Sequence, residues 1–420
     1  MSFGNTRLGR RHRRRNQYQS NRFLWMRRQR QTCHSRRRQN RGDGPRRLPS
    51  LQEFAAFGNL RHVFNHLKHT AGQAPGVDGL AYRDVGDGEA VDIIRDVSGS
   101  IIAGTYRPEP LRAVKIPKAS GGYRTLQLPT IRDRVVAAAL REAIEPAFEA
   151  IFLEHSHGFR PYRSPWTLLA LLDVMMVTSG QYILVNDDVR GAFDHVHIAT
   201  LSTSMRRAIS DPGLLALTEK ILRGHKRKEI GIAQGNPLSP LALNVLLHYA
   251  HDLVLRDRTP SWWRYADNLG AVSRNVPEGH QLRLHAEEAI NQIGLTLKGT
   301  ADPGTCVIDL MEKKASLLGY LISIQGGEMT YEMAPEAWNK LEADICLAHH
   351  ETNPPKTAQA VIRGWVDWCG PTFKNRRTDF PDKVHSLAKR LGFREIDRPE
   401  AIGERWELSW RRWQACRQAA

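Results

Sequence analysis

Two aspartates lie where a predicted strand gives way to a turn. Asp188 ends the strand pattern over 182–188, and Asp267 lies at the tip of a later predicted hairpin. Carboxylate oxygens are the ligands that a hard cation such as Mg²⁺ requires, and they must converge from separate strands to hold it. Taken singly, each aspartate is also explained as a turn residue or a helix cap. Position alone therefore leaves both interpretations open.

The segments around both aspartates resemble the motifs of reverse transcriptases. Arg264-Tyr265-Ala266-Asp267-Asn268 is similar to the Tyr-x-Asp-Asp box in the form typical of the group II intron lineage, and 188–194 resembles the first catalytic motif. The other motifs follow in the family's order within residues 75–370, at 116–118, 128–136, 158–164, 234–240, 318–320 and 363–365. The chain thus resembles a bacterial group II intron-like reverse transcriptase, of the solitary kind often associated with antiviral defence.

The resemblance implies a phosphoryl transfer assisted by two metal ions. Asp188 and Asp267 are the expected catalytic residues and metal ligands, with Asn268 as a further candidate ligand. Two Mg²⁺ ions, or Mn²⁺ in their place, would lie about 3.5–4 Å apart and stabilise the attacking and leaving oxygens. The two carboxyl groups must then face each other within about 10 Å.

The resemblance also implies a nucleotide site. Lys118 and Arg124, on a cationic hairpin, are the expected triphosphate clamp, and Phe193 is the expected wall against the sugar 2′ position, which selects deoxynucleotides. Gln234 and Gly235 would let the backbone approach the nucleotide and the template. The alternatives are a solvated hairpin edge for the two cations, a core position for Phe193 and an ordinary loop glycine.

One box position departs from the family pattern. Asn268 stands in the place of the second box aspartate. An amide offers a carbonyl oxygen but removes one negative charge, so we expect weaker metal affinity and altered rate or metal preference. The chain also ends after the expected thumb, so autonomous intron homing, which needs a DNA-binding and nuclease tail, is not expected.

Most of the net charge of +17 lies in one tail, because residues 1–50 hold 16 arginines and a single acid, Asp43. Such a run favours a polyanion, while a solubilising or targeting extension is the alternative. The residues expected to bind nucleic acid are Arg13, Arg14, Arg15, Arg36, Arg37, Arg38, Arg160, Arg163, Gly319, Arg376 and Arg377.

Hydrophobic periods indicate an α+β chain. They predict a hairpin over 111–116 and 123–128, helices over 131–152 and 241–255, strands at 306–310 and 317–324, and only helices from Pro335 onward. We expect a right-hand polymerase: a disordered basic extension (1–50), fingers with the start of the palm (51–180), a palm (181–330, with a fingers segment near 200–240) and a helical thumb (331–420).

The composition excludes two classes of protein. Five cysteines without metal-site spacing argue against a disulfide scaffold or a zinc site, and no apolar run is long enough to span a membrane. These features predict a reduced, intracellular protein with no membrane partner, and the family resemblance implies the cytoplasm of a bacterium.

The expected function is RNA-directed DNA synthesis by a nucleotidyltransferase. Its partners would be an RNA template or structured noncoding RNA, a DNA or RNA primer and deoxynucleoside triphosphates, with a second copy or an accessory protein left open. One alternative is an RNA-binding maturase or scaffold whose polymerase site has decayed, as Asn268 suggests. Another is a template-independent or protein-primed DNA polymerase.

Overall fold

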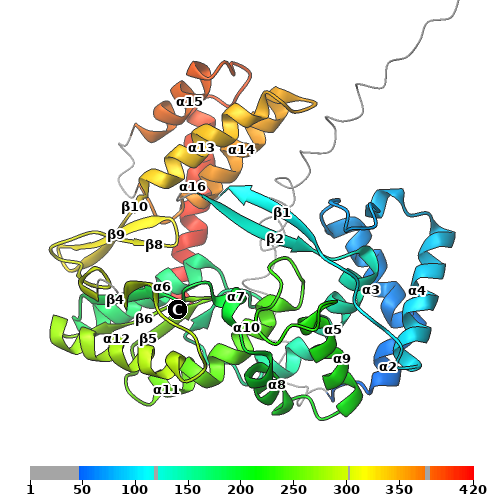
Figure 1. The fold of residues 1–420 in the computed structure, drawn as a ribbon. Coiled ribbons are helices and arrows are strands. Elements are labelled where there is room, and N and C mark those ends of the chain that lie inside the picture. The colour runs from blue at the N-terminus through cyan, green and yellow to red at the C-terminus, as the bar shows by residue number, and fades with distance from the viewer. Residues whose placement is uncertain (1–46, 118–121, 301–302, 374–378) are drawn as a thin grey trace, which may run out of the picture.

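A computed structural model describes residues 47–117, 122–300, 303–373 and 379–420 (Figure 1). Several residues predicted to act on nucleotides or nucleic acid lie outside this part of the chain: Arg13, Arg14, Arg15, Arg36, Arg37, Arg38, Lys118, Arg376 and Arg377. The predicted basic extension falls almost entirely outside it as well.

The palm is a five-stranded sheet in the order β3-β5-β6-β4-β7. Its strands are β3 (Ser156–His157), β4 (Ile183–Asp188), β5 (Trp262–Tyr265), β6 (Asn268–Ser273) and β7 (Val307–Asp309). Side chains alternate along β4: Leu184 packs in the core shared with α6 (Pro165–Ser179), whereas Ile183 and Val185 face the other layer, where α12 (Val276–Asn291) covers the sheet. Because β4 runs antiparallel to β6, its last residue arrives beside the turn between β5 and β6.

The fingers are helices around α5, with a two-stranded hairpin at one side. Residues 135–140 of α5 are each at most 2% exposed, so this helix forms the centre of the larger hydrophobic core. The elements of this part are α2 (Leu51–Ala55), α3 (Phe57–Thr70), α4 (Asp87–Ile102), β1 (Arg112–Pro117), β2 (Tyr123–Leu128), α5 (Ile131–Glu149), α7 (Ala192–His195), α8 (Ile198–Arg206), α9 (Pro212–Arg223) and α10 (Ser239–Leu247).

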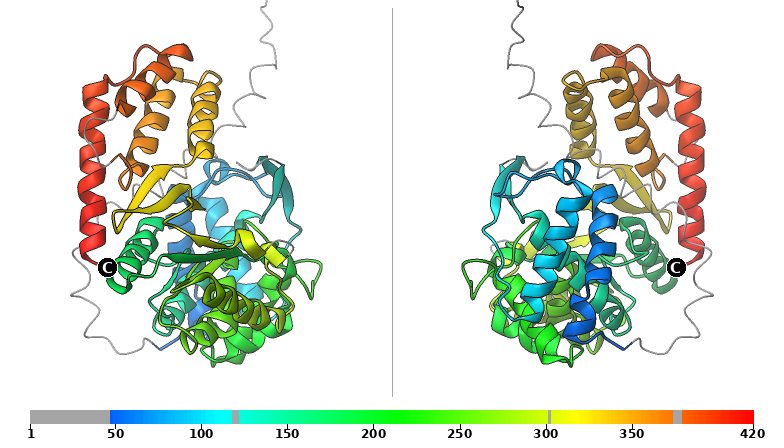
Figure 2. Two further views of the ribbon diagram at one scale, coloured as in Figure 1. Left: turned by 90° about the vertical axis from the view of Figure 1, so that its left-hand side faces the viewer. Right: turned by 90° about the vertical axis from the view of Figure 1, so that its right-hand side faces the viewer.

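The C-terminal part is a three-stranded sheet followed by helices. The elements are β8 (Ala315–Leu317), β9 (Tyr320–Gln325), β10 (Glu328–Met333), α13 (Pro335–Ala348), α14 (Pro354–Trp368), α15 (Phe380–Arg390) and α16 (Pro399–Gln418). Helix α16 returns to the palm, where Trp413 meets Trp166 of α6 edge to face at 6.3 Å and Arg417 pairs with the buried Asp173 (Figure 2). Trp406 and Trp413 are therefore core residues of this part.

The expected α+β class and right-hand arrangement are confirmed, and the described residues after 335 contain only helices and loops. One sequence prediction is wrong. The single strand expected over 317–324 is a hairpin, because Leu318 (φ 51°) and Gly319 (φ 90°) turn the chain between β8 and β9. The helix expected over 241–255 is present, and a π-helical segment, His248–Asp252, joins α10 to α11 (Leu253–Arg256) within it.

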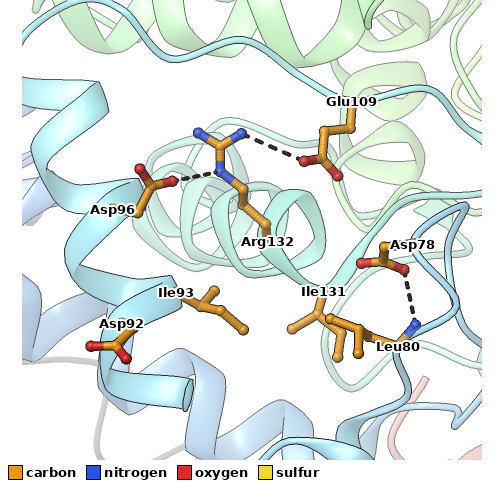
Figure 3. Close-up of a pocket in the computed structure, with 8 residues that line it drawn as sticks. All are labelled: Asp78, Leu80, Asp92, Ile93, Asp96, Glu109, Ile131 and Arg132. Carbon is orange, nitrogen blue, oxygen red and sulfur yellow. Dashed lines mark hydrogen bonds and ion pairs between the residues drawn. The ribbon is translucent and has the colours of Figure 1, made fainter. Parts of the chain in front are cut away.

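The fingers also enclose an acidic cavity of about 370 Å³ between α4 and α5 (Figure 3). Arg132 lies among its acids, 3.2 Å from a carboxylate oxygen of Asp96 and 3.9 Å from one of Glu109. Since the protein's own arginine offsets these carboxylates, the cavity is best explained as an ion-paired junction of the two helices.

Candidate active site

The two predicted catalytic aspartates lie at the same edge of the palm sheet. The strand register places Asp188, the last residue of β4, directly opposite Asn268, the first residue of β6. The backbone N–H of Val189 donates to the carbonyl oxygen of Asp267 at 3.0 Å. The β5–β6 turn and the end of β4 therefore bring Asp188, Asp267 and Asn268 together from positions about 80 residues apart in the chain.

The charges of this edge are poorly balanced. Burial raises the pKa of Asp188, and the neighbouring carboxylate of Asp267 raises it further. Burial also raises the pKa of Asp267, although the cations of Lys298, Arg264 and Arg124 oppose that shift. Two partly buried carboxylates that each disfavour ionisation form a site that gains from a bound cation.

Lys298 is the cation nearest to Asp188. Its ammonium group pairs with Asp188 Oδ2, and its side chain is 55% exposed. The backbone holds this lysine in place, because Leu297 forms a β-bridge with Val189 and the Lys298 carbonyl accepts a bond from Arg190 at 3.1 Å. Sequence reasoning missed Lys298, since that bridge joins residues more than 100 positions apart and no local motif marks it.

The donor set of the edge fits a divalent ion of the magnesium type. Asp188 Oδ1 is buried and has no hydrogen-bond partner among the described residues, so one carboxylate oxygen is free to act as a ligand. A hollow of about 290 Å³ beside it is lined by Asp187, Asp188, Asn268 and Lys298 among others, whereas Asp267 does not line it. In the described part of the chain, no three His, Cys, Asp or Glu side chains are grouped as metal ligands. This agrees with an amide, Asn268, standing where a third carboxylate would complete such a group.

The turn between β5 and β6 carries Asp267 and is called the catalytic turn here. On its inner side, which faces the protein interior, a network of hydrogen bonds around Arg264 holds it. The guanidinium of Arg264 is fully buried and donates to both carboxylate oxygens of Asp252 at 2.7 and 2.8 Å, to Asn244 at 2.8 Å and to the carbonyl of Ala266 at 2.9 Å. Burial alone would raise the pKa of Asp252, but the Arg264 charge more than offsets it and holds that pKa well below its usual value. The arginine of the box is therefore the anchor of the turn that carries Asp267.

Strand alternation turns the Asp187 side chain away from that of Asp188, although Asp187 also lines the hollow beside it. Its side chain lies on the opposite face of β4, where Arg283 of α12 donates to it at 3.0 Å and the backbone of Gly299 at 3.0 Å. It is 5% exposed and serves the packing of α12 on the sheet.

The predicted nucleotide residues surround the edge from the fingers side. Arg124 is exposed on β2, and its charge partly opposes the rise that burial causes in the pKa of Asp267. The carbonyl of Gln234 accepts a 2.6 Å bond from the Gln127 backbone of β2. Gly235 has φ +113°, and an added Cβ would lie 2.9 Å from the Gln127 carbonyl oxygen. Contact with the hairpin therefore already accounts for glycine at 235.

Phe193 lies on α7, five residues after Asp188, and is half-buried against the core of the fingers. Its ring meets that of Phe159 edge to face, with the centroids 6.3 Å apart. The position is compatible with both uses predicted for it, a core residue and a wall beside the nucleotide.

The nucleic-acid role predicted for Arg160 is not supported. This side chain is buried, and its guanidinium donates to Glu149 and to the carbonyls of Leu153 and Ser156 at 2.6 and 2.7 Å. Its donors are engaged within the protein, so it orders the loop that follows β3. Arg163 is half-buried and donates to the carbonyl of Glu154 at 3.0 Å, and Gly319 is exposed in the β8–β9 turn.

Comparison with known proteins places this site in a family. Residues 116–300 match the family model described as reverse transcriptase (RNA-dependent DNA polymerase). The chain is 33% identical over 216 residues to protein YkfC of Escherichia coli, covering 47% of this chain and 56% of that protein. It is 33% identical over 181 residues to the group II intron-encoded protein LtrA of Lactococcus lactis, covering 41% of this chain and 30% of that protein.

Two further similarities are more limited. Nuclear intron maturase 1 of Arabidopsis thaliana is 34% identical over 95 residues, covering 23% of this chain and 13% of that protein. The Sicinivirus RNA-dependent RNA polymerase superposes with a TM-score of 0.49 at 11% identity, over 90% of this chain and 91% of that chain.

The matched region spans about half of YkfC and less of the other curated relatives. Among the described helices, none is long and apolar enough to cross a membrane. The family match covers β2, the helices from α5 to α10 and the palm edge that holds Asp188 and Asp267, while α2, α3, α4 and most of β1 precede it. Residues 116–300 are therefore similar to reverse transcriptases, and group II intron-encoded proteins are among the relatives of the chain.

Proposed function

We propose that the protein is an RNA-directed DNA polymerase that adds deoxynucleotides to a primer 3′-hydroxyl by a two-metal phosphoryl transfer. One observation carries the proposal: Asp188 and Asp267 share one sheet edge, and Asp188 Oδ1 is buried there without a partner among the described residues. A buried carboxylate oxygen left unsatisfied in a segment that resembles a catalytic motif is the arrangement expected where a metal ion completes the site.

Each residue of the edge then has a defined task. Asp188 and Asp267 would hold the divalent ions, with the Asn268 carbonyl as an additional donor, and the ions would supply charge stabilisation for the attacking and leaving oxygens. Arg124 would offset charge on the triphosphate, while the Gln127–Gln234 backbone bond ties its hairpin to the loop before α10. The chain's own groups thus orient the nucleotide.

The nucleic-acid partner is proposed from the relatives and from the tail. Group II intron-encoded and maturase proteins are among the relatives, and the arginine-rich residues 1–50 favour a polyanion. We infer an RNA template, in particular a dedicated or structured noncoding RNA, with a DNA or RNA primer. A role in antiviral defence in the bacterial cytoplasm is the biological setting that the family resemblance suggests.

The test is primer extension on a defined RNA template with deoxynucleotides and Mg²⁺ or Mn²⁺, using the wild type and Asp267→Asn. We expect metal-dependent incorporation that Asp267→Asn abolishes, while both proteins bind the primer–template equally in a filter assay. Absence of incorporation by the wild type with either metal contradicts the proposal.

RNA binding without synthesis is the second candidate function. Asn268, which removes one carboxylate from the box, is the observation that favours it. It predicts that the wild type binds structured RNA and incorporates nothing, and that Asp267→Asn is indistinguishable from it in every assay.

A further inference from the structure

The loop after β3 is pressed against the catalytic turn. An added Cβ on Gly158 would lie 2.5 Å from the backbone nitrogen of Ala266, so the two backbones are in direct contact. The N–H of Ala266 donates to the carbonyl of His157 at 3.1 Å, and the side chain of Asn244 donates to the carbonyl of Gly158 at 3.0 Å. The start of this loop therefore has a fixed position relative to Asp267.

The next residue, Phe159, is held in an unfavourable conformation. Its φ is 55°, a region that a bulky side chain rarely adopts, and its side chain is 48% exposed. Gly158 fixes the loop on one side of it and the buried Arg160 on the other. An aromatic residue kept strained and exposed gains little from burial, so its use lies in what the ring touches.

The ring of Phe159 touches Phe193. The planes are inclined at 78° with the centroids 6.3 Å apart, so the edge of one ring meets the face of the other. Phe193 follows β4 on α7, and its backbone carbonyl is held by the N–H of Ile232 at 2.8 Å. The two rings thus come from opposite sides of the catalytic edge, one from the loop after β3 and one from the helix after β4.

We propose that Phe159 is a specificity-determining residue, which holds the Phe193 ring against the 2′ position of the incoming nucleotide and so excludes ribonucleotides. The inference rests on the proposed polymerase function and extends it to a second aromatic residue. Phe193 alone is only half-buried, so its ring has room to tilt away from the sugar. Contact with the Phe159 ring prevents this tilt of the Phe193 ring.

The test compares kcat/KM for a deoxynucleotide with that for the ribonucleotide of the same base on one primer–template. In Phe159→Ala we expect the ratio to fall about tenfold through a gain in ribonucleotide use, since an aromatic pair contributes on this scale. Phe159→Tyr keeps the ring edge and should retain most of the discrimination. Tyr162→Ala, the other exposed aromatic with a left-handed φ in the loop, is the matched control and should leave the ratio unchanged.

A double variant separates this role from a general effect on the loop. If Phe159 acts through Phe193, then adding Phe159→Ala to Phe193→Ala lowers the ratio no further. An unchanged ratio in Phe159→Ala, or an equal loss for both nucleotides, overturns the inference while the proposed function stands. A wild type that incorporates neither nucleotide overturns both.

Discussion

The two sides of the catalytic turn differ in how their polar groups are satisfied. On the inner side, the buried guanidinium of Arg264 is matched by Asp252, by Asn244 and by the carbonyl of Ala266. On the outer side, among the described residues, one oxygen of Asp188 has no partner, and its other oxygen pairs with the half-exposed Lys298. The inner side has the complete bonding of a structural network, and the outer side has the incomplete bonding of a site that awaits a ligand.

The acidic cavity of the fingers sharpens this contrast. Its carboxylates, like those of the catalytic edge, lie close together, but Arg132 is enclosed among them and pairs with two of them. Clustered acids alone therefore do not indicate a metal site in this protein. The distinguishing feature is the meeting of Asp188 and Asp267 at one sheet edge, together with a buried oxygen of Asp188 that has no partner among the described residues.

Removing the carboxylate charge of Asp188, on the outer side, should produce the largest effect, a loss of nucleotide incorporation. Asp188→Asn is expected to lower incorporation by about a thousandfold or more, because a metal ligand is lost. Its melting temperature should not fall, because burial disfavours the ionised form of Asp188 in the folded state. Primer extension and thermal unfolding measure the two effects. Asp257→Asn, at an exposed ion pair, is the control and should change neither.

Removing the Arg264 guanidinium from the inner side should instead destabilise the fold. Arg264→Leu leaves Asp252 buried without its partner and is expected to reduce the free energy of unfolding by about 3–5 kcal/mol. Urea denaturation measures this loss. Arg256→Leu, which removes an exposed ion pair on α11, should cost less than about 1 kcal/mol. Equal costs at the two arginines would contradict the importance of the buried network.

Two glycine-to-alanine variants test whether the loop after β3 positions the catalytic turn. Gly158→Ala and Gly180→Ala both place alanine at a positive φ, but only Gly158 faces another backbone. We expect Gly180→Ala to cost about 1 kcal/mol of stability, and Gly158→Ala to cost about 1–3 kcal/mol more and to reduce kcat. If the two variants behave alike, the loop does not position the turn.

Restoring the family aspartate should change metal affinity more modestly. Asn268→Asp adds a carboxylate opposite Asp188, so we expect the Mg²⁺ concentration for half-maximal activity to fall by about tenfold. Without metal, the added like charge should lower the melting temperature. A melting temperature that falls and is not recovered with Mg²⁺ would show that position 268 does not face the ions.

The smallest effect is expected at Lys298. Lys298→Gln removes a cation that competes for Asp188, so the half-maximal Mg²⁺ concentration should fall about threefold, a small change because the pair is half-exposed. A rise in that concentration would mean that Lys298 supports the bound substrate rather than opposing the metal.

The sequence predicted the parts of this site that depend on local pattern. Asp188 and Asp267 each lie where a strand signal ends, and both segments resemble reverse transcriptase motifs. Lys298 and the buried Arg160 were beyond such reasoning, because their partners lie on distant or differently folded segments. The β8–β9 turn was also missed, since nothing in the local sequence signals that Leu318 adopts a left-handed conformation.

The central claim is that Asp188 and Asp267 together hold the catalytic ions. Its most direct test is anomalous scattering from crystals of the protein grown with primer–template, a non-hydrolysable deoxynucleotide and Mn²⁺. The account predicts manganese peaks within about 2.5 Å of oxygens from both carboxylates. Manganese bound elsewhere, with these two side chains unliganded, would contradict it.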